Sequence, residues 1–134
     1  MRTLFNRTLI FIYLSCSNHT GVELKQTLTN VNTKQINLSV LQYNMPKDTV
    51  FTITNTGKYP LAIQNVETCC GCTTPIRTKK TIKPGKNGEL KVSYDAKYPG
   101  QFHKTITVFT NVQNGSIRLS ISGEVELDEY EERK

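Results

Sequence analysis

The sequence contains no tryptophan, little alanine and no apolar run long enough to cross a bilayer, which takes about 20 residues. Its plentiful β-branched and aromatic residues suit a pleated, half-buried surface better than a helix. The apolar run LIFIYL, residues 9–14, is too short for a membrane-spanning helix. With 134 residues, 37% of them hydrophobic, the chain has the length and composition of one globular domain.

Acidic residues are also scarce over most of the chain. Residues 16–123 hold 13 Lys or Arg against 5 Asp or Glu, whereas residues 124–134 hold 6 acids and 2 bases. We therefore treat residues 126–134 as an acidic C-terminal tail, distinct from the basic body of the chain. A basic body is typical of proteins that bind nucleic acid or an acidic surface, but it also favours solubility, and we prefer solubility.

The cations form one cluster, RTKKTIKPGK at residues 77–86. A nucleic-acid-binding segment would interleave aromatic residues for stacking on bases, and this stretch has none. We predict no nucleic-acid partner and interpret the cluster as a solvated loop near a membrane or glycan surface.

Catalytic motifs are missing as well. There is no GxSxG, HExxH, phosphate-binding glycine loop or paired-carboxylate motif, and the five acids of the body are scattered singly. We interpret both histidines as solvated, His19 in a linker and His103 on the outer face of a strand. The protein is therefore predicted not to be an enzyme and to need no cofactor.

The first sixteen residues have the layout of a secretory signal. Arg2 and Arg7 give a cationic start, the short apolar run follows, and the small residue Ser15 precedes Cys16. YLSC, residues 13–16, resembles the lipobox of bacterial lipoproteins, in which cleavage leaves a cysteine that carries the acyl chains. We predict a signal peptide at 1–15, lipidation of Cys16 and a polar tether at 16–33. The alternative is a plain signal peptide in which Cys16 is incidental.

From residue 34 to residue 125 the apolar residues follow a period of two, with turn signals roughly every 8–12 residues. This pattern predicts an all-β, antiparallel β-sandwich of about seven strands. Ile36, Leu38 and Val40 alternate with polar residues, a one-residue slip before Val66 predicts a bulge, and Asn114-Gly115 predicts a hairpin. The side chains predicted to point inward are Phe51, Ile53, Leu61, Ile63, Leu90, Val92, Ile106, Val108, Leu119 and Ile121.

Four segments in order, FTITNTGKYPLAIQNVETCCGCTTP, IKPGKNGELKVSYD, GQFHKTITVFTN and LSISGEV, resemble the bacterial family called Domain of Unknown Function 1573 over residues 48–125. The resemblance implies an immunoglobulin-like sandwich of seven strands and export, often as a lipoprotein, and it implies no activity. The family's C-G-C segment maps onto Cys70, Gly71 and Cys72, and Cys69 departs from its pattern. In such bacteria Asp48-Thr49-Val50 also fits a short O-glycosylation sequon, although it equally suits the start of a strand.

Three of the cysteines lie within four consecutive positions, 69–72. If Cys16 is acylated, Cys69, Cys70 and Cys72 can form at most one intramolecular disulfide, which an oxidising compartment favours. Cys69–Cys70 would distort the intervening peptide, Cys70–Cys72 closes a small ring, and Cys69–Cys72 has the C-x-x-C spacing. Gly71 would ease each pairing through its backbone freedom.

Three interpretations of the cysteine cluster remain open: structural, thiol-redox and metal-binding. The three thiolates suit Cu(I), whereas zinc would need a fourth ligand such as His103 or His19. For redox chemistry, Arg77, Lys79 and Lys80 would supply positive potential. Cys70 and Cys72 share a strand phase with Val66, which predicts neighbouring sulfurs at one end of the sandwich and Cys69 turned elsewhere.

These observations favour a non-catalytic binding or scaffolding lipoprotein of the cell envelope, exported and anchored in the inner or outer membrane. Its expected partner is a protein or glycan, and it contacts the membrane through the lipid anchor only. The alternative function is a small envelope protein that uses Cys69, Cys70 and Cys72 for thiol-redox chemistry or Cu(I) binding.

Overall fold

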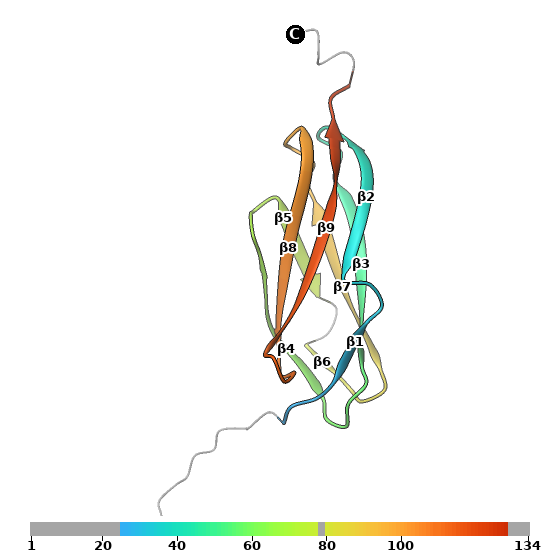
Figure 1. The fold of residues 1–134 in the computed structure, drawn as a ribbon, viewed down its shortest axis with the longest axis vertical. Helices are drawn as coiled ribbons and strands as arrows, with labels where there is room; N and C mark the ends of the chain where they lie inside the picture. Colours follow the sequence, from blue (N-terminus) through green and yellow to red (C-terminus); the bar gives the residue numbers. More distant parts are fainter. Residues whose placement is uncertain (1–24, 78–79, 129–134) are drawn as a thin grey trace, which may run out of the picture.

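The protein is described by a computed structural model that places residues 25–77 and 80–128. Over these residues the chain folds into two packed sheets and contains no helix, hence none that could span a membrane (Figure 1). The strands are β1 (Thr29–Val31), β2 (Gln35–Gln42), β3 (Lys47–Asn55), β4 (Leu61–Thr68), β5 (Thr73–Arg77), β6 (Thr81–Ile82), β7 (Asn87–Tyr94), β8 (Gly100–Thr110) and β9 (Ser116–Glu126).

The sheets have the orders β1-β3-β7-β5 and β2-β9-β8-β4-β6. The predicted all-β sandwich is confirmed, with nine described strands instead of about seven, because β1 and β6 are only three and two residues long. β1 lies within residues predicted as tether. It becomes a strand because it pairs with the end of β3, where Val31 lies opposite Ile53.

One strand pairing differs from the predicted antiparallel arrangement. β1 joins the first sheet, the chain then crosses over, and β2 runs parallel to β9 in the second sheet. The N-terminal strands thus cover part of one edge in each sheet, and uncovered edges are sites of unwanted pairing. A period of two is the same for both strand directions, so the pattern could not indicate this pairing.

The core is the predicted one. All ten side chains predicted to point inward are buried, because alternate residues of each strand face the opposite sheet. At the end of the core the rings of Tyr94 and Phe102 stack with centroids 4.1 Å apart.

Two bulges adjust the strands. The predicted slip in β4 is confirmed by a register shift between Ile63 and Asn65. A second bulge, in β2, was not predicted: Ser39 has a φ of 62°, and its N–H donates to Asn37 Oδ1 at 2.8 Å. Because of this bulge Val40 points outward and is 52% exposed, and Leu41 takes the buried position. The inward orientation implied for Val40 was therefore wrong.

A buried asparagine, Asn55, the last residue of β3, joins the loops at one end of the sandwich. Its Nδ2 donates to the carbonyl oxygens of Tyr59 (2.7 Å) and Ile82 (2.9 Å). Its Oδ1 accepts from Thr27 Oγ1 and from the Gly57 N–H, both at 3.0 Å. An amide has two donor hydrogens and an oxygen with two lone pairs, so one side chain is fully used to connect three segments.

Asn111 makes a second connection at the same end. Its Nδ2 donates to the carbonyl oxygens of Lys25 and Pro60, both at 2.9 Å, and its Oδ1 accepts from the Ala62 N–H at 2.8 Å. We call this part of the molecule the lysine end and define it as residues 25–28, 56–60, 83–86 and 111–115. Asn55 and Asn111 together make it a fixed arrangement of loops.

Candidate functional site

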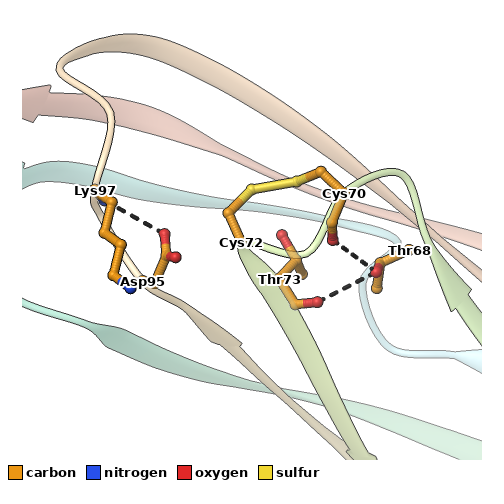
Figure 2. Close-up of a disulfide and its surroundings, with 6 residues drawn as sticks. All are labelled: Thr68, Cys70, Cys72, Thr73, Asp95 and Lys97. Atoms are coloured by element: carbon orange, nitrogen blue, oxygen red, sulfur yellow. Dashed lines mark hydrogen bonds between the residues drawn. A yellow bond between two sulfur atoms is a disulfide. The ribbon is translucent and has the colours of Figure 1, made fainter.

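The cysteine cluster lies at the opposite end of the sandwich, in the loop between β4 and β5 (Figures 1 and 2). Cys70 and Cys72 form a disulfide with their Cα atoms 5.5 Å apart, and Cys69 is free and exposed. Of the three pairings left open by the sequence, the structure therefore contains the one across Gly71. As the strand phase predicted, the two sulfurs meet at an end of the sandwich and Cys69 is turned away.

The loop is held by hydrogen bonds from both sides. Thr68, the last residue of β4, donates through Oγ1 to the carbonyl oxygens of Cys70 (3.0 Å) and Thr73 (3.2 Å), as Figure 2 shows. The Asp95 N–H donates to the Cys72 carbonyl oxygen at 3.1 Å. The disulfide is therefore fixed between the turn that leaves β4 and the turn that follows β7.

The structure does not support the role predicted for Gly71. Its φ is not in the left-handed region, and a Cβ built on it would meet nothing within 4 Å. The backbone here does not require glycine, so the proposed easing of the pairing was wrong. A side chain at this position would extend into open space.

An open groove of about 550 Å³ borders the disulfide. Besides both cysteines of the bond and Gly71, it is lined by Asp95, Lys97, Tyr98 and Lys104. The charged side chains that border the groove are therefore two lysines, Lys97 and Lys104, and one carboxylate, Asp95. Of the cations named from the sequence, Lys80 lies next to β6, close to the start of β4, away from the cysteines, while the Arg77 side chain and Lys79 fall outside the described residues.

We call residues 43–46, 69–72 and 95–99 the cysteine end. Its loops are joined, since the Asn44 N–H donates to the Ala96 carbonyl oxygen at 2.9 Å. Two apolar side chains stand out from it: Met45 is 63% exposed and Tyr98 is 68% exposed. Lys97 and Tyr98 lie in the turn after β7 and Lys104 lies on β8, so their positions in the sequence do not indicate that they meet the cysteines.

The structure lends no support to a metal site at the cysteines. A disulfide offers no thiolates, so Cys70 and Cys72 cannot hold Cu(I) in this form. His103 is exposed on β8, and among residues 25–77 and 80–128 no three metal-ligating side chains gather. His19, the other histidine considered for zinc, and Cys16, the predicted lipidation site, lie outside the described residues.

The disulfide contributes little to global stability by its covalent constraint. A bond between residues two positions apart removes little freedom from the unfolded chain, about 1.5 kcal/mol by loop-closure entropy. A ring that closes 15 residues would contribute about 3 kcal/mol on the same scale. The covalent constraint therefore adds little to the buried strand faces that hold the fold, although Cys72 itself is buried in the core.

Asp48, in the possible glycosylation sequon, lies at the start of β3 and forms an ion pair with Lys91 at 2.7 Å. Hydrogen bonds from the side chains of Lys91 and Ser93 hold the pKa of the Asp48 carboxyl below its ordinary value. The structure therefore gives this carboxylate a cross-strand partner on β7, which accounts for an acid at this position without a modification.

Comparison with known proteins identifies a family and a fold. The family described as "Protein of unknown function (DUF1573)" matches residues 29–125, and no curated protein matches. A protein of unknown function from Porphyromonas gingivalis W83 is similar (20% identity, TM-score 0.68, 75% of this chain and 48% of that chain). So is PapD-like domain 7 of human CEP192 (8% identity, TM-score 0.64, 78% and 89%).

The Vibrio cholerae protease VesB also matches in part (18% identity, TM-score 0.58, 75% of this chain and 32% of that chain). The chain spans about half the length of the P. gingivalis protein, at 48%, and a smaller share of VesB. At these identities the likeness shows the fold alone, an immunoglobulin-like, PapD-like sandwich.

Proposed function

The chain belongs to the DUF1573 family, whose function is unknown, and we propose that it is a non-catalytic lipoprotein domain that presents a binding surface at the cell envelope. The observation that supports the proposal is that the two ends of the sandwich carry different features. The described chain begins at the lysine end, and the β2–β3 and β7–β8 loops, which carry the exposed residues Met45 and Tyr98, lie at the other end (Figure 1).

Attachment at Cys16 would orient the two ends of the domain relative to the membrane. Residues 16–24 separate Cys16 from the described domain and, fully extended, span at most roughly 30 Å. An acyl chain at Cys16 would therefore keep the lysine end near the bilayer and turn the cysteine end away from it. The loops around Met45 and Tyr98 would then be the part offered to a protein or glycan.

The surface at the cysteine end has features of a recognition site. Tyrosine and methionine are enriched where proteins bind one another, and a tyrosine can bury a ring while its hydroxyl remains hydrogen-bonded. The backbone around Tyr98 is fixed by the Asn44–Ala96 and Asp95–Cys72 hydrogen bonds. Little loop freedom would be lost on binding, which favours affinity.

Replacing Cys16 with serine tests the proposed attachment to the membrane. Without a thiol to acylate, the protein should move from the membrane fraction to the soluble fraction of the cell envelope when membranes are washed at high salt, which screens contacts held by charge alone. Fractionation of cells, followed by detection of the chain in each fraction, measures this change, with Cys69→Ser as the matched control that should stay with the membrane. Unchanged fractionation of Cys16→Ser would show that the lipobox interpretation is wrong.

Replacing Met45 and Tyr98 with alanine tests the proposed surface. In a pull-down from envelope extracts, wild-type protein should capture a partner that the double variant loses by at least about tenfold, as expected when interface anchors are truncated. Val50→Ala, at another exposed apolar residue, is the control and should capture as wild type does. Equal capture by all three proteins would remove the cysteine end as the binding surface.

A further inference from the structure

We propose that the lysine end is itself a docking surface for an anionic lipid bilayer, a second membrane contact besides the proposed acyl anchor. The inference deepens the proposed function, because it relies on that function for the presence of a membrane nearby. It assigns a partner to Lys83 and Lys86, the part of the basic cluster that lies at the lysine end and that the binding surface at the cysteine end leaves without a role.

The charge at this end has one sign. Lys25, Lys58, Lys83 and Lys86 are all exposed there, although they come from three separate segments of the sequence. Among the described acids, Glu89 lies near this end, on β7 three residues after Lys86, and the others lie away from it: Asp48, Glu67, Asp95, Glu124, Glu126 and Asp128. Grouped lysines without interspersed acids attract an anionic surface, because each lysine near anionic lipid adds to the attraction within a Debye length.

Exposed apolar groups accompany the lysines. Leu28 is 62% exposed and Tyr59 is 41% exposed, both within the lysine end. The Lys25 Nζ lies 5.1 Å from the centre of the Tyr59 ring, so a cation and an aromatic ring form one unit. This combination suits the headgroup region, where a tyrosine ring and a leucine enter the boundary and ammonium groups remain with phosphates.

The pairing of Leu28 and Tyr59 with the lysines is the reason to favour a bilayer over an acidic glycan. A soluble polyanion would neutralise the lysines but would leave both exposed apolar side chains in water. A bilayer satisfies the lysines and buries the apolar side chains in the same contact. The surface is also prearranged, since Asn55 and Asn111 hold its loops by hydrogen bonds.

The chain geometry brings this surface to the bilayer in the proposed lipoprotein. Lys25 is the first described residue, and its carbonyl oxygen is bound by Asn111 at the lysine end. The tether therefore enters at the surface itself, and roughly 30 Å of extended chain is its greatest reach. Docking would hold the sandwich upright on the membrane with the cysteine end outward.

The test uses residues 16–134 carrying Cys16→Ser, so that no acyl chain contributes, mixed with vesicles of phosphatidylcholine with or without phosphatidylglycerol. We expect flotation with the anionic vesicles only, and weaker binding as salt is raised. In the same protein, Lys58→Gln/Lys83→Gln/Lys86→Gln should weaken binding about 100-fold, taking roughly fivefold for each lysine near the lipid surface.

The matched control is Lys47→Gln/Lys97→Gln/Lys104→Gln, which removes the same charge near the cysteine end and should bind as the parent does. Thermal unfolding of each variant confirms that it is folded. Equal loss in both triple variants, no binding to anionic vesicles, or full competition by a soluble anionic polysaccharide would overturn the proposal. Because the tested protein has no anchor, these outcomes are independent of whether Cys16 is acylated in cells.

Discussion

Replacing Asn55 with alanine is expected to lower the free energy of unfolding by about 4 kcal/mol, taking roughly 1 kcal/mol for each of its four hydrogen bonds. The partners of the lost amide include the Ile82 carbonyl oxygen and the Thr27 hydroxyl. Both lie in the interior, where water does not replace a lost hydrogen bond, which is why the cost exceeds that of a typical polar substitution. Urea unfolding of the two proteins measures the difference.

Two further variants make this result specific to the buried amide. Asn87→Ala removes one hydrogen bond to Thr54 at an exposed position and should cost no more than about 0.5 kcal/mol. Asn55→Asp keeps an acceptor but cannot donate to Tyr59 and Ile82, so it should also destabilise the protein. An Asn55→Ala protein no less stable than Asn87→Ala would mean that the loops are held by other contacts.

Adding a methyl group at Gly57 should cost about 2 kcal/mol, within the usual range for overpacking. A Cβ at this position would lie 2.5 Å from the backbone nitrogen of Leu28 and would also overlap the Thr27 hydroxyl. Backbone cannot move aside as a flexible side chain can. Gly57→Ala must therefore push the segment that leads into β1 away from the loop after β3, and the same unfolding measurement detects the loss.

Gly71→Ala is the matched glycine control. Its Cβ would enter open space and its φ suits any residue, so alanine should be neutral or more stable by about 0.5 kcal/mol, because it restricts the unfolded chain. If Gly71→Ala cost as much as Gly57→Ala, steric contact at Gly57 would not be the cause of its effect.

The sequence predicted the parts of the fold that depend on neighbouring residues. The inward faces follow from alternation, and the β4 bulge follows from one broken alternation before Val66. The β2 bulge was not predicted, because the alternation of apolar and polar residues continues across Ser39 as it would in a regular strand. At Gly123, a Cβ would lie 2.7 Å from the Ser39 carbonyl oxygen, so a glycine distant in the sequence makes room for this bulge.

The candidate sites show the same limit. The strand phase of Cys70 and Cys72 was sufficient to predict that their sulfurs meet, whereas the groove beside them depends on a turn more than twenty positions later. The sequence likewise showed one basic run at 77–86. Only the folded chain shows that Lys83 and Lys86 belong with Lys25 and Lys58, because buried Asn55 and Asn111 bring those segments together.

The parallel pairing of β2 with β9 has a mechanical consequence. Residues 25 and 128 lie at opposite ends of the sandwich, and both strands run from the lysine end toward the cysteine end (Figure 1). Tension applied between these two ends of the described chain would pull β2 and β9 in opposite directions along their lengths. The hydrogen bonds between them would share that load in shear and would not open one at a time, so this pairing resists unravelling from either end of the described chain.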